Sequence, residues 1–292
     1  MTPEDRLKIL QNYIAKMPSL STTVTKVLEI CNDPSSSPHD LNRLISLDPV
    51  LTGQVLKLIN SAYYGLSSRV TSLTKAIIML GLNTVKNLVL ATSVLASFTG
   101  SQTGTAFTTD QYWAHCLFVG TTSKMLAGMC HVPKLEQEEY FVAGLLHDLG
   151  KLPMIACFGE LYNQAVKECN DKNIPLSQAE KHYIGFDHCQ VGLLIGAKWK
   201  LNNDMRHALV HHHNPLAENC KPGKLLYSMS LANQLAFHFQ IGHAGDWHSD
   251  QLMIQALSDR LSISVNDILA QKAQIEQEIE KARIFLKGSG KG

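Results

Sequence analysis

The stretch FVAGLLHDLGK, from Phe141 to Lys151, places a histidine and an aspartate at the end of an apolar helical run. The run extends from Glu138 to Leu149 and predicts a buried helix that Gly150 terminates. Successive helical residues point about 100° apart, so His147 and Asp148 can reach one ion only near the helix end or where the helix unwinds. We therefore interpret the pair either as part of a metal site or, more simply, as a hydrogen-bonded helix cap.

Helical periodicity continues from this stretch toward both ends of the chain, and the predicted fold class is all-α. On the N-terminal side, a helix is expected from Pro3 to Lys16. A capping residue followed by proline predicts that two further helices start at Ser37-Pro38 and at Asp48-Pro49. The helix that starts at Asp48-Pro49 is expected to end at Gly65. Ser72 opens another. The remaining helices are predicted at 84–98, from Asp110 onward, and at 154–170, 177–184, 188–200, 204–213, 223–240, 249–261 and 265–286.

The segment TGSQTGTAFTT, residues 99–109, lacks apolar periodicity and is rich in Gly, Ser and Thr. Such composition favours a linker. We therefore predict an N-terminal helical subdomain over residues 1–105, a second helical subdomain over 106–245, and a C-terminal helical extension with a tail over 246–292.

Composition limits the possible functions. The chain has 292 residues, 45% of them hydrophobic, and its 26 basic and 25 acidic side chains nearly cancel, which favours neither a nucleic-acid nor a membrane partner. Seven cysteines without a CxxC pair are expected to be reduced thiols. The N-terminus, MTPEDRLKIL, lacks a signal-peptide core, and no apolar stretch is expected to approach the roughly 20 residues of a membrane span. A cytoplasmic location is expected.

The histidines are distributed unevenly. Of thirteen, only His39 precedes residue 110. Imidazole is a common ligand of zinc, iron and similar cations. The clustering therefore suggests that other histidines after residue 110 join His147 and Asp148 in one metal site. The candidates are His115, His188, and the run His211-His212-His213. Six histidines are interpreted as surface or locally satisfied side chains: His182, His207, His211, His238, His243 and His248.

Lys151 directly follows the break after His147-Asp148. A lysine beside a metal can hold a phosphate oxygen as a point charge. We therefore take Asp148 and Lys151 as candidate catalytic residues.

The ordered series His115, His147-Asp148, His188, His212-His213 resembles the HD superfamily of metal-dependent phosphohydrolases. The N-terminal half narrows the resemblance to the HDOD family, the HD-related output domain of bacterial signalling proteins. The resemblance covers most of residues 15 to 243. The motifs that carry it are MPSLSTTVTKVLEI, LNRLISLDPVLTGQVLKLINSAYYG, TSLTKAIIMLGLNTVKNLVL, GLLHDLGKL, GFDHCQVGLLIGAKWKL and ALVHHHNP.

The resemblance implies an N-terminal helical subdomain packed on an HD-type helical bundle that binds divalent iron, manganese or zinc. Carried over by position, His115 is the first ligand, His147 and Asp148 are the central pair, and a second metal is served by His188, His212 and His213. The family's last ligand is an aspartate, and here that position is Asn233. Gln111 stands where some two-metal relatives have a glutamate, and no GYP segment follows His213.

These departures favour a signalling module that is weakly catalytic or non-catalytic and that binds a protein partner. The alternative is a metal-dependent phosphohydrolase acting on a nucleotide or other phosphoester. A third hypothesis, DNA binding, arises from the helix, turn and helix between residues 72 and 98. That segment offers only Lys86 and Asn87 as obvious contacts to DNA and is otherwise apolar, so it is expected to be buried.

Overall fold

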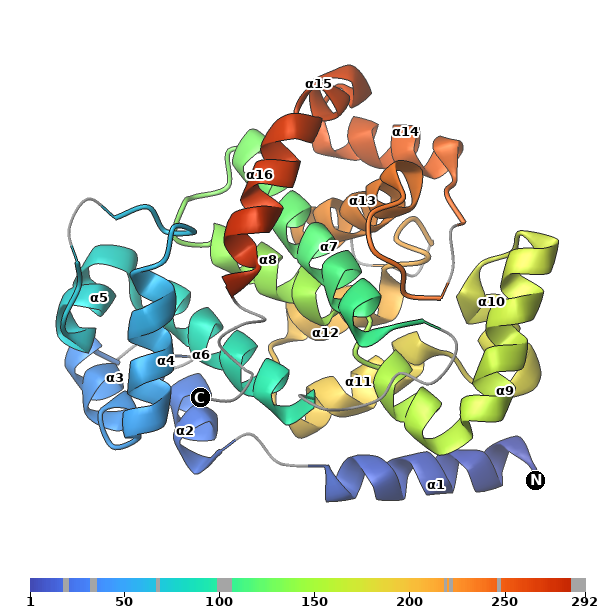
Figure 1. Ribbon diagram of the computed structural model, residues 1–292, viewed down its shortest axis with the longest axis horizontal. Coiled ribbons are helices and arrows are strands. Elements are labelled where there is room, and N and C mark those ends of the chain that lie inside the picture. Colours follow the sequence, from blue (N-terminus) through green and yellow to red (C-terminus); the bar gives the residue numbers. More distant parts are fainter. Residues whose placement is uncertain are drawn as a thin grey trace.

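The computed structural model describes residues 1–17, 21–31, 36–66, 69–98, 107–217, 220, 223–245 and 248–284. Within these ranges the chain forms helices and no strand, so the all-α prediction is confirmed (Figure 1). The helices are α1 (Pro3–Lys16), α2 (Thr22–Cys31), α3 (Pro38–Ile45), α4 (Pro49–Ile59), α5 (Leu73–Leu80), α6 (Leu82–Phe98), α7 (Thr109–Met129), α8 (Gln137–Leu146), α9 (Lys151–Lys172), α10 (Leu176–Tyr183), α11 (His188–Lys198), α12 (Asn203–His211), α13 (Lys224–Phe239), α14 (Gln251–Leu261), α15 (Val265–Ala270) and α16 (Lys272–Ala282).

The predicted helix starts match the observed caps in the N-terminal half. The side chains of Ser37, Asp48 and Ser72 each accept a hydrogen bond from a backbone N–H in the first turn of the helix that follows. Several boundaries differ from prediction. Helix α8 ends at Leu146 rather than at Leu149, and Gly150 precedes the first residue of α9 instead of terminating α8. Helix α4 ends at Ile59 rather than at Gly65, and Thr108, not Asp110, caps α7 through a capping box.

Helices α2 to α6 form one group, and α6 joins this group to the rest of the molecule (Figure 1). Helix α6 packs against α2, α4 and α5 on one side and against α8 on the other. Its apolar residues between Val85 and Val94 are buried, and Asn87 is only 3% exposed. The bend of 116° between α5 and α6 resembles a helix-turn-helix. However, packing covers the helix that would have to enter a DNA groove.

Helices α7, α8 and α13 form the centre of the larger group. Two glycines allow α7 and α8 to approach closely: a Cβ on Gly144 would lie 2.7 Å from the Cα of Gly120, and a Cβ on Gly120 would lie 2.6 Å from the carbonyl oxygen of Phe141. This crossing lies five residues after His115 on α7 and three residues before His147. It therefore fixes the distance between two of the candidate ligands.

Helix α1 docks on α9 and α11. Lys198 donates hydrogen bonds to the carbonyl oxygens of Ile14, Ala15 and Met17, at 2.7, 3.1 and 2.7 Å, and so satisfies the C-terminal carbonyls of α1. Arg6 donates to two carbonyls at the end of α10. The predicted linker at 99–109 falls almost wholly outside the described residues, and the division of the chain at residues 105 and 245 stays a prediction.

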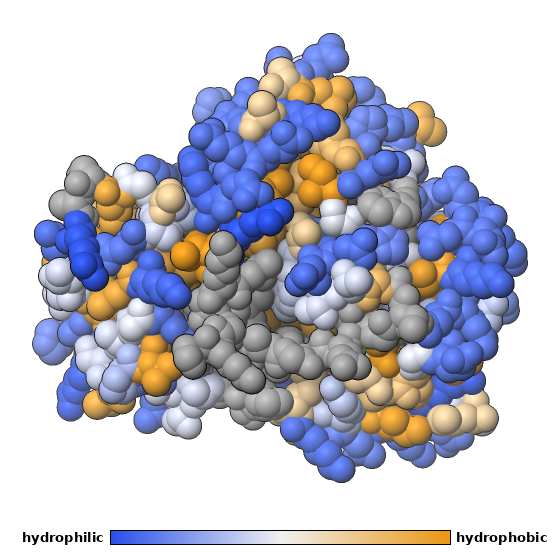
Figure 2. Space-filling view, viewed as in Figure 1, coloured by the Kyte–Doolittle hydropathy of each residue, from blue (hydrophilic) through white to orange (hydrophobic). Residues whose placement is uncertain are grey.

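The predicted helix over 265–286 is two helices, because the chain breaks at Gln271 between α15 and α16. Helix α16 packs on α7 through its buried face, which includes Ile275 and Ile279. Its outward face is hydrophilic, as is that of α10 (Figure 2).

The continuous run Gln137–Lys172, which joins α8 to α9, is long and apolar enough to cross a membrane. The expectation that no apolar stretch approaches that length is therefore wrong. Its most apolar window has a mean hydropathy of 1.4, and 89% of that window is buried inside the protein. The apolar composition is accounted for by the position of these helices in the protein core.

Candidate metal centre

His147 and Asp148 lie in a tight turn that separates α8 from α9. Helix α8 ends at Leu146, the backbone N–H of Lys151 bonds the carbonyl of Asp148 at 2.9 Å, and α9 begins immediately. Gly150 keeps right-handed helical dihedral angles, so the glycine is not required for an unwound backbone. It is required for space, because a Cβ there would lie 2.0 Å from the carbonyl oxygen of His188 on α11. The absence of a side chain at Gly150 thus allows α11 to place His188 beside His147 and Asp148.

Three predicted ligands meet on one side of this turn. The Nε2 atoms of His115 and His147 are 3.3 Å apart, and they lie 3.6 and 3.3 Å from Oδ2 of Asp148. All three side chains are buried. His115 comes from the middle of α7, and its ring stacks on Phe237 of α13 with the centroids 5.5 Å apart.

Three further predicted ligands meet on the other side. Nε2 of His188, the first residue of α11, lies 3.4 Å from Nε2 of His212 and 3.0 Å from Nε2 of His213. Oδ1 of Asp148 lies 3.3 Å from His188 Nε2 and 3.7 Å from His212 Nε2. Asp148 therefore bridges two histidine clusters, each of which draws on separate helices.

The outward nitrogens of three imidazoles are held by neighbouring groups. Nδ1 of His147 bonds the carbonyl of Gly144 at 2.7 Å, and Nδ1 of His212 bonds the carbonyl of Leu209 at 2.9 Å. Nδ1 of His188 contacts Oε2 of Glu180 at 2.6 Å. Such partners fix the ring and leave Nε2 as the inward-facing lone pair, which is the usual arrangement around metal-binding histidines.

Burial and charge set the protonation of the cluster. Burial lowers the pKa of His147, and it lowers the pKa values of His115 and His213 well below the usual range. These three rings are therefore neutral, the form that binds metal. Burial opposes charge on His188 and His212 as well, but Glu180 raises the pKa of His188 well above its usual value, and Cys189 and Asp148 raise the pKa of His212 to about 9.

Asp148 has the environment expected of a metal ligand. Burial alone would raise its pKa, but the neighbouring His147 and Lys151 hold the pKa well below its usual range, so the carboxylate is charged. Neither carboxylate oxygen accepts a hydrogen bond of good geometry from the described residues, although both are fully buried. A buried carboxylate without such bonds is costly unless a cation compensates it. The residues present therefore fit a divalent cation.

Lys151 supplies part of that compensation within the protein. Its ammonium is completely buried, 2.7 Å from Oδ2 of Asp148, and it donates a hydrogen bond of 2.8 Å to the carbonyl of Ala244. The structure thus brings both candidate catalytic residues together. It also places the lysine within the wall of the site.

The two positions that depart from the HD pattern have different environments. Gln111 is part of the capping box of α7, where its Oε1 accepts hydrogen bonds from Thr108. Asn233 is buried on α13, one turn before the Phe237 that stacks on His115. Oδ1 of Asn233 accepts no hydrogen bond from the described residues.

Two members of the site were not predicted. Glu180, on α10, is completely buried and contacts both the backbone N–H and the imidazole of His188. The second member is Cys189, which lies in the group of His188, His212 and His213. Its Sγ is 3.8 Å from Nδ1 of His212. Sequence alone gave no signal for Glu180, because eight residues and the turn at Gly185 separate it from His188. Cys189 is one of the seven cysteines that the sequence predicts only to be reduced thiols.

A cavity of about 210 Å³ reaches the centre at His213. Helix α13 contributes Gln234 and Phe237 to its wall, and Cys189 lines the same wall. Polar and charged residues also line it, namely Ser177, Lys181, Asp187, Asn214, His248 and Asp250. The candidate centre therefore borders a cavity that suits a small polar molecule.

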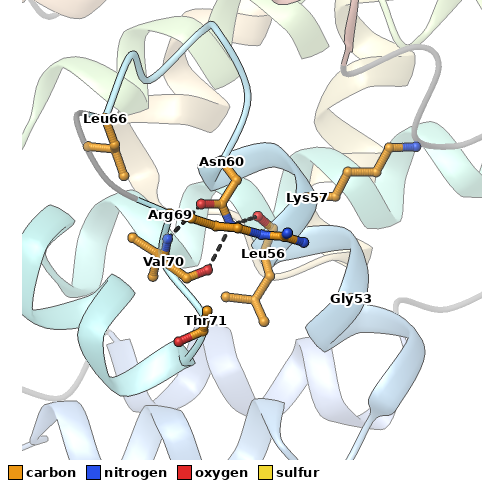
Figure 3. A pocket seen from close by; sticks show the side chains of 8 residues that line it. All are labelled: Gly53, Leu56, Lys57, Asn60, Leu66, Arg69, Val70 and Thr71. Carbon is orange, nitrogen blue, oxygen red and sulfur yellow. Dashed lines mark hydrogen bonds between the residues drawn. The ribbon is translucent and has the colours of Figure 1, made fainter.

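A larger hollow, of about 750 Å³, lies on the N-terminal group at α4 and the chain that follows it. Figure 3 shows Asn60 at its centre, where the side-chain amide bonds the backbone of Leu56 and Val70, and Lys57 points away from Arg69. The amide is fully used in holding the backbone, and the lining includes no histidine or carboxylate. Despite its size, this hollow has no chemistry comparable with that of the centre at Asp148.

Most histidines interpreted as satisfied have local partners. His182 pairs with Glu168 at 3.2 Å, and His238 bonds Gln251 at 3.2 Å. The backbone N–H of His243 bonds the carbonyl of Gln111. His248 lines the small cavity, and its buried Nδ1 has no hydrogen-bond partner among the described residues, so this ring is not locally satisfied. His207 and His211 lie together on a half-exposed face of α12, with ring centroids 4.5 Å apart.

Known sequences resemble the chain over most of its length. The family model of the HDOD domain matches residues 17–215. An uncharacterised protein of Treponema pallidum (strain Nichols) is 26% identical over 229 residues, which cover 77% of this chain and 43% of the relative. This chain therefore spans less than half of that relative.

Three crystal structures share the fold. An HDOD domain protein of unknown function from Geobacter sulfurreducens has a TM-score of 0.76 at 23% identity, with 97% of this chain and 98% of that chain covered. A candidate phosphohydrolase from Shewanella amazonensis SB2B has a TM-score of 0.72 at 21% identity, with 95% and 97% covered. A candidate signal transduction protein from Marinobacter aquaeolei VT8 has a TM-score of 0.75 at 18% identity, with 99% and 66% covered.

Proposed function

Because the chain belongs to the HDOD family, we propose that it is a cytoplasmic bacterial signalling module with an HD-type metal centre of weak or no catalytic activity. His115, His147 and Asp148 would hold one divalent cation, and His188, His212 and His213 would complete a second position. When bound, iron, manganese or zinc would supply Lewis acidity toward a phosphate oxygen. The module would transmit the state of this centre to a protein partner.

The observation that carries the proposal is the placement of Asp148 between two groups of inward-facing imidazoles. Its buried oxygens lie 3.3 to 3.7 Å from the Nε2 atoms of His115, His147, His188 and His212 and lack well-formed hydrogen bonds from the described residues. Lys151 forms an ion pair with Oδ2 at 2.7 Å, but a purely structural cluster would be expected to pair Oδ1 as well.

Three features support weak turnover. Asn233 stands at the last ligand position of the HD pattern and brings no charge, which lowers metal affinity and water activation. Lys151 is already held by Asp148 and Ala244, so it is not pre-positioned toward a substrate phosphate. The cavity at His213 is small, about 210 Å³, which suits a small ligand better than a large substrate.

The alternative is a phosphohydrolase acting on a nucleotide or other phosphoester. The cavity favours it, because Lys181 and His248 line a space that ends at His213. In this reading the Asp148 carboxylate orients the reacting groups, and Lys151 moves from Ala244 to steady the leaving phosphate. The fold shared with a candidate phosphohydrolase is consistent with this alternative.

Elemental analysis and an activity assay separate the two readings. Protein purified without chelator is expected to contain near-stoichiometric iron, manganese or zinc, and His147→Ala is expected to lose it. A panel of nucleotides and phosphoesters then tests turnover. Phosphate release that His147→Ala abolishes would establish the phosphohydrolase, whereas a loaded but inactive protein supports the signalling module. A chain that stays metal-free after reconstitution would overturn the metal centre itself.

A further inference from the structure

A second group of metal-ligating side chains lies outside the centre at Asp148. Helix α12 carries His207 and His211 four residues apart, so both rings project from one face, with centroids 4.5 Å apart and planes tilted by 42°. The other side of the same helix end carries His212, which is buried in the metal centre. The end of α12 thus presents imidazoles in two different directions.

The chain returns to this face after α12. Turns after the helix are closed by hydrogen bonds from the N–H of Asn214 to the carbonyl of His211, at 2.9 Å, and from the N–H of Cys220 to the carbonyl of Ala217, at 2.9 Å. They place Sγ of Cys220 3.7 Å from Nε2 of His207. Nitrogens of both histidines and the sulfur lie within 4.8 Å of one another, and all three residues are half-buried.

These distances suit a tetrahedral ion. Zinc–sulfur bonds of about 2.3 Å and zinc–nitrogen bonds of about 2.0 to 2.1 Å place tetrahedral ligand atoms roughly 3.3 to 3.7 Å apart. The Cys220–His207 pair already has such a separation, and small side-chain rotations would bring in His211. The charge nearby is favourable, because Glu136, Glu139 and Asp204 line the cavity that His207 also lines.

We propose that His207, His211 and Cys220 form a second, separate metal site, which binds Zn²⁺ through two imidazoles and one thiolate and leaves a fourth position for water. On binding, the zinc–sulfur bond forms and the thiol proton passes to solvent. Because His211 directly precedes His212 and His213, an ion at the site fixes the segment that presents those two residues to the centre at Asp148. The two sites share no ligand.

Cobalt substitution tests this site in the full-length protein. The metal-stripped chain is titrated with Co²⁺, which gives a thiolate-to-cobalt charge-transfer band in the near ultraviolet only where sulfur is a ligand. The band is expected in the wild type and in His147→Ala, and Zn²⁺ is expected to abolish it. Cys220→Ser is expected to lose the band and Cys157→Ser, a half-buried thiol outside every group of candidate ligands in the described residues, to keep it. Absence of the band from the wild type, or its persistence in Cys220→Ser, would overturn the proposal.

A second measurement needs no variant. Alkylation of Cys220 in the native protein, read by mass spectrometry of the peptide that contains it, is expected to slow at least tenfold when one equivalent of Zn²⁺ beyond the occupancy of the Asp148 centre is added. Cys31 serves as the internal reference, since it lies outside every group of candidate ligands in the described residues. An unchanged rate at Cys220 would contradict the site.

Discussion

Glu180 holds His188 by two contacts, 2.9 Å to its backbone N–H and 2.6 Å to Nδ1. Glu180→Gln keeps the shape of the side chain but removes the charge that makes the imidazole a stronger ligand. We expect the affinity of the centre for a divalent metal to fall by about 10- to 100-fold, as is typical when an outer partner of a metal ligand is changed. Competition with a chromophoric chelator measures the change.

The control is Glu168→Gln, since Glu168 also pairs with a histidine but does so at the surface. Equal affinities for the Glu180→Gln protein and the wild type would show that His188 is not oriented by this carboxylate.

Lys151 compensates the buried charge of Asp148. In Lys151→Met the carboxylate keeps only imidazole neighbours, and removing one partner of a buried pair costs about 3 to 5 kcal/mol. We expect the free energy of unfolding of the metal-free protein to fall by that amount in urea titrations, and added metal to recover part of the loss. Lys172→Met, which breaks an exposed pair, should change stability little. If both variants behaved alike, Lys151 would have no such role.

At the scale of the elements, glycines set how closely the helices of the site approach. Gly150→Ala places a Cβ against the backbone of α11, which must shift and move His188. We expect a loss of about 1 to 3 kcal/mol or more, as in overpacked cores, together with reduced metal content. Gly53→Ala on α4 is the matched control: a Cβ there meets nothing within 4 Å, so stability should rise by about 0.5 to 1 kcal/mol. Urea unfolding and elemental analysis of both variants decide the matter.

At the scale of the whole molecule, the centre at Asp148 connects helices from across the bundle. Its ligands come from α7, the α8–α9 turn, α11 and the end of α12. A metal that binds only this assembled arrangement should stabilise the fold by about 2.7 kcal/mol at a free concentration 100 times its Kd. Thermal unfolding of the stripped protein with increasing metal tests this, and His147→Ala should lose most of the increase. A melting temperature independent of metal would contradict the coupling.

Prediction from sequence succeeded where the signals were local. Proline after a capping residue located the starts of α3 and α4, and the spacing of apolar residues gave most of the other helices, because caps and helix periodicity act over a few residues. The break at Gln271 was missed because Ile268 and Ile275 continue the apolar spacing across it. The length of the α8–α9 run was also underestimated.

The sequence by itself determined the helical class, the family and the identities of six candidate ligands, because motif residues and helix signals are written in short segments of the chain. Only the tertiary structure decided how the ligands meet: that Asp148 bridges two histidine clusters, that Glu180 holds His188, that Lys151 faces inward, and that Cys220 returns to His207 and His211. The contacts of Asp148 with His115 and His212 join residues that other helices separate, and the remaining contacts depend on how the chain turns between neighbouring helices. Close backbone approaches such as that at Gly150 fix these arrangements. The spacing of residues along the chain does not predict how closely two helices approach each other.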